Sequence, residues 1–142
     1  MSGRYRAACI VAVLLMVACV GDRPVVERFV EGSWEPAAAR VASLTGGRDG
    51  TAVRFRLRLA GEPELEVEVE ATLEIDPRPR LVAGRWSEGA GGRSGPVSAA
   101  AIDFFGGQGG VPSLRGQLTL AAEGAPIYRI HLPTTPLERA PG

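Results

Sequence analysis

The chain has 142 residues, of which 45% are hydrophobic and 23% are charged, a balance typical of one folded domain. Its 16 basic residues are matched by 16 acidic ones, so the net charge is zero. A nucleic-acid partner requires a basic surface that neutralises phosphates, and the composition therefore excludes nucleic acid as an expected partner.

The first 18 residues have the organisation of an export signal. Arg4 and Arg6 precede twelve consecutive apolar residues, Ala7–Ala18. Twelve is the length of the apolar part of a signal peptide, whereas a helix that spans a bilayer needs about 20 such residues. A cut after Ala18 places Met16 at the third position before the cut, where ordinary signal peptidase prefers a small residue. Cleavage by that enzyme therefore fits this stretch poorly. The two arginines and the length of the apolar run that follows them predict a signal peptide, formed as a helix, over residues 1–18.

The stretch Met16-Val17-Ala18-Cys19 resembles the lipobox of bacterial lipoproteins. The resemblance implies cleavage before Cys19, acylation of that cysteine, and residues 19–26 as the lipidated N-terminus and spacer. It also implies a lipid-anchored place in the cell envelope, in the outer membrane because Val20 is not aspartate. Cys9 leaves with the signal, so Cys19 has no disulfide partner in the mature chain. A plain secretory signal, with Cys19 an ordinary apolar residue, is the alternative.

From residue 27 onward, apolar and polar residues alternate between glycine and proline turns, which is the pattern of antiparallel strands. We predict one all-β domain over residues 27–136, an antiparallel meander of about eight strands that closes as a small barrel or sandwich. Residues 137–142 are expected to form a loose tail, and Pro36–Arg40 allow a helical turn as an alternative. The predicted strands are Glu27–Glu35, Arg40–Thr45, Val53–Leu59, Leu65–Glu70, Leu81–Ser87, Val97–Phe105, Leu114–Ala122 and Ile127–Leu132.

Two of these strands predict a hairpin with a defined register. If Val53–Leu59 pairs with Leu65–Glu70 so that residue numbers sum to 124, Leu57 faces Val67 and Arg56 faces Glu68. A slip of one residue would turn the charges into the core, so the register is strongly specified. We interpret the resulting ladder of arginines and glutamates as a solvated outer face with cross-strand ion pairs. A recognition surface is the alternative.

Glycines inside the predicted strands indicate sharp curvature. Gly32, Gly84 and Gly116 each stand between apolar residues two positions away, as expected where strands bend into a barrel. Gly32-Ser33-Trp34 also resembles the Gly-x-Trp of lipocalin-type (calycin) barrels, which implies that Trp34 packs under Arg129 of the last strand. The residues expected to face inward are Trp34, Phe55, Leu57, Val67, Val69, Trp86, Phe104, Leu118 and Tyr128.

Residues suited to catalysis or metal binding are few and scattered. His131 is the only histidine, and a Ser-His-Asp set would need Asp103 or Asp76 beside it. The nearest nucleophile, Ser94, lies in a loop-like stretch and not in a Gly-x-Ser-x-Gly turn. A metal site would need three or four ligands. We therefore expect a non-enzymatic protein with no catalytic residue, no metal and no cofactor.

The glycine-rich stretch Phe104–Ser113 is the most distinctive part of the domain. It lacks the Lys-Ser/Thr of a phosphate-binding loop, and we interpret it as a wide hairpin loop. The alternative is a binding lip at a barrel mouth, formed by Phe104, Phe105 and Gln108. The expected function is an envelope binding module for an apolar small molecule or a protein partner. An accessory structural subunit with a filled core is the alternative, and an interior cavity of a few hundred Å3 distinguishes the two.

Overall fold

The computed structural model describes residues 24–73, 80–89, 92–105 and 111–139. All regular secondary structure in these residues is β-strand, which confirms the predicted all-β class. The predicted signal peptide, Cys19 and Gln108 lie outside the described residues. No helix in the described ranges has the length and apolar character that a membrane crossing requires.

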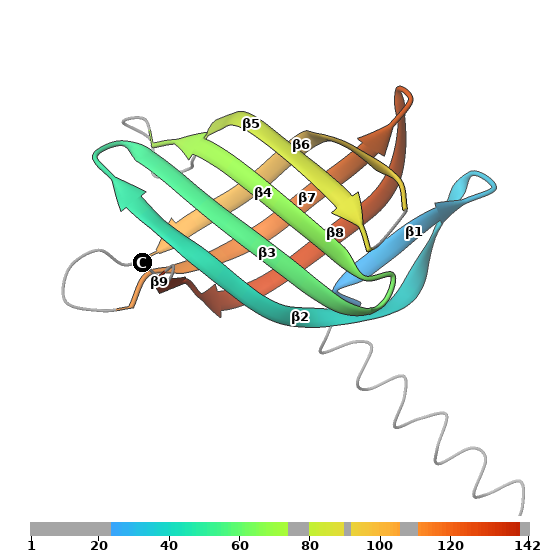
Figure 1. Ribbon diagram of the computed structural model, residues 1–142, viewed down its shortest axis with the longest axis horizontal. Helices are drawn as coiled ribbons and strands as arrows, with labels where there is room; N and C mark the ends of the chain where they lie inside the picture. Colours follow the sequence, from blue (N-terminus) through green and yellow to red (C-terminus); the bar gives the residue numbers. More distant parts are fainter. Residues whose placement is uncertain (1–23, 74–79, 90–91, 106–110, 140–142) are drawn as a thin grey trace, which may run out of the picture.

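The described residues form nine strands, and eight of them close into an antiparallel barrel (Figure 1). Each of the eight pairs with the next along the chain, and β1 also pairs with β8 and so closes the wall. The eight are β1 (Val26–Val30), β2 (Ser33–Asp49), β3 (Ala52–Glu62), β4 (Leu65–Thr72), β5 (Arg80–Glu88), β6 (Ser94–Phe105), β7 (Ser113–Ala122) and β8 (Ala125–Pro136). The ninth, β9 (Glu138–Arg139), pairs in parallel with β2.

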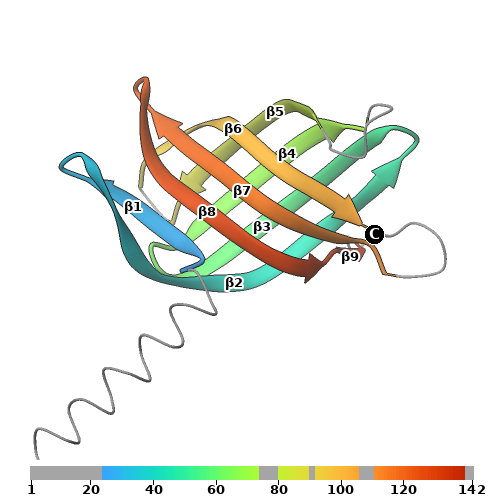
Figure 2. The same ribbon diagram turned by 180° about the vertical axis from the view of Figure 1, so that it is seen from behind.

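The closing strand β1 is short. Its five residues pair with Ser33–Ala37 on one side, and three of them pair with Tyr128–Ile130 on the other. The rest of β2 pairs with β3, and Thr45 and Gly46 of β2 also pair with β9. Figure 2 shows β6, β7 and β8 across one wall, with the β1–β2 hairpin projecting at one end of the barrel.

The predicted hairpin is present as β3 and β4, in the predicted register. Leu57 pairs with Val67, Arg56 with Glu68, and Leu59 with Leu65. The apolar partners are buried and the charged partners face outward. Strict alternation of the two residue classes therefore determined both the register and the face.

The predicted strand Glu27–Glu35 is wrong, because it contains a turn. Glu31 and Gly32 have φ angles of 48° and 83°, and they connect β1 to β2 as a two-residue hairpin loop. Two successive positive φ angles give the turn whose twist matches that of two antiparallel strands. Gly32, expected inside a strand, lies in this turn.

The predicted strand Arg40–Thr45 is part of a much longer one. β2 has 17 residues and includes Pro36–Arg40, so the alternative of a helical turn is wrong. Pairing with β1 and β3 outweighs the preference of the three alanines in this stretch for helical conformation. The register shifts between Val41 and Ser43, which indicates a β-bulge that bends β2 around the barrel.

Apolar side chains fill the barrel interior. Among the described residues, 21 hydrophobic residues are buried and no polar or charged residue is. The interior of an eight-stranded barrel is just wide enough for side chains to fill. Of the residues predicted to face inward, seven are buried in this core and Phe104 packs against it partly buried. The seven are Phe55, Leu57, Val67, Val69, Trp86, Leu118 and Tyr128.

Trp34 faces outward, contrary to its prediction as a core residue. It pairs with Phe29 across the β1–β2 hairpin, and the two ring centroids are 5.0 Å apart. The turn places Ala37 opposite the buried Val26, so the odd-numbered residues of β2 before the bulge face inward. The even-numbered residues, Trp34 among them, face outward.

Leu137 belongs to the barrel and not to a loose tail. Its side chain is 2% exposed, and its N–H donates to the carbonyl oxygen of Pro112 at 2.7 Å. The next two residues form β9. The expectation of a loose tail therefore does not hold for residues 137–139, because an apolar side chain at the barrel end is buried there.

Gly46 and Gly116 are two of the glycines that allow one strand to approach the backbone of the next. A Cβ atom on Gly46 would lie 2.1 Å from the carbonyl oxygen of Arg54, and one on Gly116 would lie 2.2 Å from that of Ala101. Their φ angles, 149° and 148°, are ones that side-chain-bearing residues rarely adopt. The sequence pattern identified Gly116 but not Gly46.

Candidate functional site

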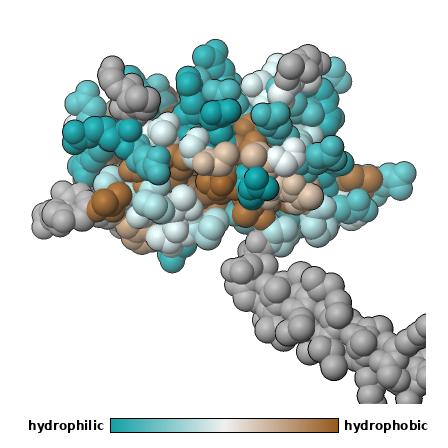
Figure 3. Space-filling view, turned by 60° about the horizontal axis from the view of Figure 1, so that its bottom comes forward, coloured by the Kyte–Doolittle hydropathy of each residue, from teal (hydrophilic) through white to brown (hydrophobic). Residues whose placement is uncertain are grey.

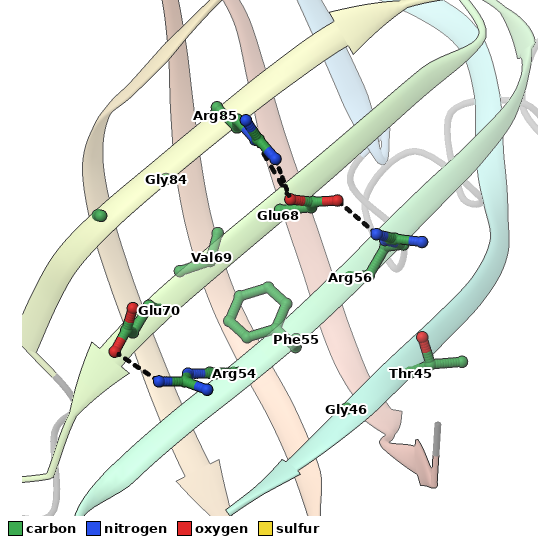
Figure 4. Close-up of a pocket in the computed structure, with 11 residues that line it drawn as sticks. Thr45, Gly46, Arg54, Phe55, Arg56, Glu68, Val69, Glu70, Gly84 and Arg85 are labelled. Atoms are coloured by element: carbon green, nitrogen blue, oxygen red, sulfur yellow. Dashed lines mark hydrogen bonds and ion pairs between the residues drawn. The ribbon is translucent and has the colours of Figure 1, made fainter. Parts of the chain in front are cut away.

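An open groove of about 630 Å3 crosses the outer face of β2, β3, β4 and β5 (Figure 4). Its floor follows the row Gly46, Phe55, Val69 and Gly84, which strand pairing places side by side. The side chains of Phe55 and Val69 are buried in the barrel core, so the outer side of this row presents backbone. The groove is therefore a surface feature and not the mouth of an interior cavity.

Charged side chains of the two neighbouring rows form the walls of the groove. On one side, Glu68 accepts hydrogen bonds from Arg56 and, at 3.2 Å, from Arg85. On the other side, Arg54 donates to Glu70 at 3.4 Å. The side chains of Arg54 and Arg85 are 75% and 80% exposed, so their remaining donors face solvent. Three arginines against two glutamates give the walls one net positive charge.

Glu68 lies at the centre of this ladder. Hydrogen bonds from Arg56 and Arg85, with the charges of both, lower the pKa of Glu68 below its ordinary value despite partial burial, which acts to raise it. Such exposed pairs contribute less than about 1 kcal/mol to folding. Their larger consequence is that they hold planar guanidinium groups in place, and these groups suit the carboxylates of a partner.

A second pocket, of about 600 Å3, lies at the barrel end that contains Phe104. Phe104, Pro112 and Leu137 supply its apolar lining, and Arg48 and Arg139 supply charge. Of the two predicted lip residues that the structure describes, Phe104 lines this pocket and Phe105 does not.

Phe105 does not join Phe104 in this pocket. Adjacent residues of a strand point to opposite faces. Phe105 is 39% exposed, and the guanidinium carbon of Arg115 lies 4.9 Å from its ring centroid. Gln108, the third predicted lip residue, lies outside the described residues.

Glu27, Arg129, His131 and Trp34 meet on the outer face where β1 closes the barrel. Oε1 of Glu27 accepts hydrogen bonds from Nη2 and Nε of Arg129 at 2.8 and 3.0 Å, and it also contacts Nε2 of His131. The guanidinium carbon of Arg129 lies 4.5 Å from the Trp34 ring centroid. A contact between Arg129 and Trp34 is what the resemblance to calycin barrels implied, and here it lies on the outer face.

This closure cluster makes the stability of the barrel dependent on pH. Burial acts to raise the pKa of Glu27, but hydrogen bonds and charges from His131 and Arg129 outweigh it, and the pKa is lowered from an ordinary 4.5. The stabilisation by the Glu27 carboxylate is therefore complete above pH 4.5. It is lost as the pH falls through the lower pKa of Glu27 in the folded protein.

Replacing Glu27 by glutamine is expected to lower the free energy of unfolding at pH 7 by about 1–2 kcal/mol, because a charge-assisted contact across the barrel closure is lost. The variant should also lose less stability than the wild type between pH 5 and pH 3. Urea unfolding at several pH values measures both effects. Glu66→Gln on the exposed ladder is the matched control, and an equal loss in the control would contradict the assignment.

His131 belongs to the closure cluster. Its Nε2 contacts Oε1 of Glu27, whereas Oδ2 of Asp103 lies 3.7 Å from Nη2 of Arg115. Ser94 begins β6 and is exposed, and Asp76 lies outside the described residues. Within the residues that the structure describes, no group of three or more histidine, cysteine, aspartate and glutamate side chains is placed to hold a metal ion.

Some of the residues that line the groove were predicted from the sequence to share one outer face, and others were not. Arg54, Arg56, Glu68 and Glu70 were predicted on one outer face. Arg85 was not assigned to that face, although the predicted inward position of Trp86 put its neighbour outward. Pairing of β4 with β5 brings Arg85 opposite Glu68.

Comparison of the chain with protein families, with curated proteins and with solved structures finds no match.

Proposed function

We propose that the protein is a lipoprotein of the bacterial cell envelope, anchored in the outer membrane through Cys19. In this proposal it is a non-enzymatic binding module that recognises a protein partner through the groove on β2–β5. The observation that carries the binding part is the open groove with the exposed Arg54 and Arg85; the 21 apolar residues buried in the described chain fill the interior, as the accessory-subunit alternative also requires. This filling favours a partner on the outside over an apolar molecule within the barrel.

The chemistry of the groove favours an acidic segment of the partner. Arg54 and Arg85 direct exposed guanidinium groups over a floor of backbone, and each is only partly occupied by one glutamate. A carboxylate that approaches from solvent accepts two parallel hydrogen bonds from such a group. An accessory subunit of an envelope assembly would use the same surface.

Replacing Cys19 by alanine is expected to abolish the incorporation of radioactive palmitate and to block processing of the signal, because the acylated residue is missing. Labelling of the expressed protein in bacterial cells measures both. Cys9→Ala is the matched control and should be labelled like the wild type. Normal labelling of the Cys19 variant would refute the anchor.

A photo-crosslinking residue at Ala83, which lines the groove, is expected to give one discrete adduct in cells. The same residue at Ala101, exposed on β6, should not give it. The double variant Arg54→Glu, Glu70→Arg keeps an ion pair but reverses the charges on one wall, and the adduct should disappear. An adduct that survives this exchange contradicts recognition by the groove. If Phe104→Asp removes the adduct instead, the end pocket is the binding site.

A further inference from the structure

The outer row of β2 differs from those of β3 and β4. Before its bulge, β2 presents Trp34, Pro36, Ala38, Arg40 and Ala42 outward, a row with one charge and no carboxylate. Four of the five are exposed and Trp34 is half-buried. On β3 and β4, by contrast, each outward position of the ladder carries a charge. The outer row of β2 is thus less charged than those of β3 and β4, although the exposed Glu62 of β3 lies opposite Ala38 and the exposed Glu31 lies in the β1–β2 turn.

Aromatic side chains continue this row onto the β1–β2 hairpin. Phe29 is 37% exposed and its ring contacts that of Trp34 at an interplanar angle of 58°, and Arg129 lies over the Trp34 ring. The carboxylate of Glu27 is satisfied by Arg129 and His131. Figure 3 brings the side of the molecule that carries β2 forward and shows apolar side chains in a band across it. Tryptophan is enriched at membrane–water interfaces, and arginine can lay its aliphatic stem on apolar surface there while its charge stays in water.

The chain enters the barrel on this same side. The carbonyl oxygen of Val25, next to the start of β1, accepts a hydrogen bond from the N–H of His131 at 2.7 Å. Five Cα–Cα steps separate Cys19 from Pro24. Such a segment spans at most about 18 Å. A domain of this size has a radius of gyration of about 13 Å and is therefore roughly 35 Å across. The segment between Cys19 and Pro24 is shorter than the barrel is wide. It therefore keeps the side of the barrel on which the chain enters next to the lipid anchor proposed at Cys19.

We infer that the face formed by β1, the β1–β2 hairpin and the outer row of β2 lies against the phospholipid bilayer. The inference rests on the lipid anchor proposed for Cys19. Phe29 and Trp34 lie at the level of the headgroups, and Arg40 and Arg129 meet the lipid phosphates. The groove meets β2 only at Thr45 and Gly46, beyond the bulge, and extends away from this face to β5, which is four positions away from β1 around the barrel of eight.

Fluorescence quenching tests the inference with the native lipoprotein reconstituted into vesicles. The vesicles contain phosphatidylethanolamine and phosphatidylglycerol, with or without brominated acyl chains. The chain has two tryptophans, so Trp34→Phe leaves only the buried Trp86. Brominated lipid should reduce the emission of the wild type and leave that of Trp34→Phe unchanged. In the Trp34→Phe background, a new tryptophan at Val82, which is 57% exposed on β5, should also remain unquenched.

Flotation of the vesicles separates failure of the inference from failure of the anchor. Protein that floats with the vesicles but shows no quenching of Trp34, or equal quenching at position 82, overturns the membrane-facing orientation and leaves the anchor intact. Protein that does not float contradicts the anchor, and the orientation falls with it. Quenching confined to Trp34 supports both.

Discussion

Replacing Trp86 by alanine is expected to lower the free energy of unfolding by about 3–5 kcal/mol, because it leaves a large cavity in a filled barrel. Trp86 is 2% exposed, and its ring meets that of Tyr128 edge-on at a centroid distance of 5.5 Å. Its Nε1 donates to the carbonyl oxygen of Ala121 at 2.9 Å, so the substitution also leaves a buried acceptor unpaired. Urea unfolding followed by circular dichroism measures the loss.

Two variants separate the causes of this effect. Trp86→Phe keeps most of the ring and removes the hydrogen bond, and it should cost about 1–3 kcal/mol. Trp34→Ala removes the same side chain from the outer face and should cost less than Trp86→Ala. If the two alanine variants were equally unstable, the assignment of Trp86 to the core and Trp34 to the surface would be wrong.

Replacing Gly46 by alanine is expected to cost about 3 kcal/mol or more, because the added Cβ strains the backbone and overpacks it at the same time. The clash is with the backbone of Arg54 and Phe55, at 2.1 and 2.7 Å, and not with a flexible side chain that could move away. Relief would require β2 and β3 to separate. Thermal and urea unfolding of the variant measure the effect.

The neighbouring glycine provides a matched control in the same strand. A Cβ on Gly47 meets nothing within 4 Å, so Gly47→Ala should leave stability almost unchanged or raise it slightly. Similar behaviour of the two variants would contradict the close approach of β2 and β3 at Gly46. Both variants replace glycine by alanine in the same strand, so a difference in their stability reflects the backbone contact at Gly46 and not a difference in conformational propensity.

Alternation in the sequence predicted the part of the fold in which each strand has one apolar and one charged face. In β3 and β4 a wrong register would bury arginine beside glutamate, so only one pairing satisfies both faces. The same alternation predicted that Trp86 faces inward and that His131 does not. The hairpin alone predicted the part of the outer ladder formed by Arg54, Arg56, Glu68 and Glu70.

The remaining features depend on contacts that the sequence pattern does not carry. Glu31 in the β1–β2 turn has a positive φ of 48°, unusual for glutamate, so no turn signal beyond Gly32 marks the division of the first predicted strand. Burial of Leu137 depends on the barrel end being formed by strands distant in sequence. Assembly of Arg85 and Gly46 into one groove likewise requires the order of four strands, which local periodicity cannot supply.

The closure of the barrel has a consequence for the timing of folding. Its polar contact joins Glu27 to Arg129, residues 102 positions apart, so the wall cannot close until nearly the whole domain is available. Contacts between such distant residues form slowly because a long loop must close first. The chain is proposed to cross a membrane before it folds. Late closure of the barrel would then keep the polypeptide unfolded, and able to pass through the membrane, until its last strand has crossed.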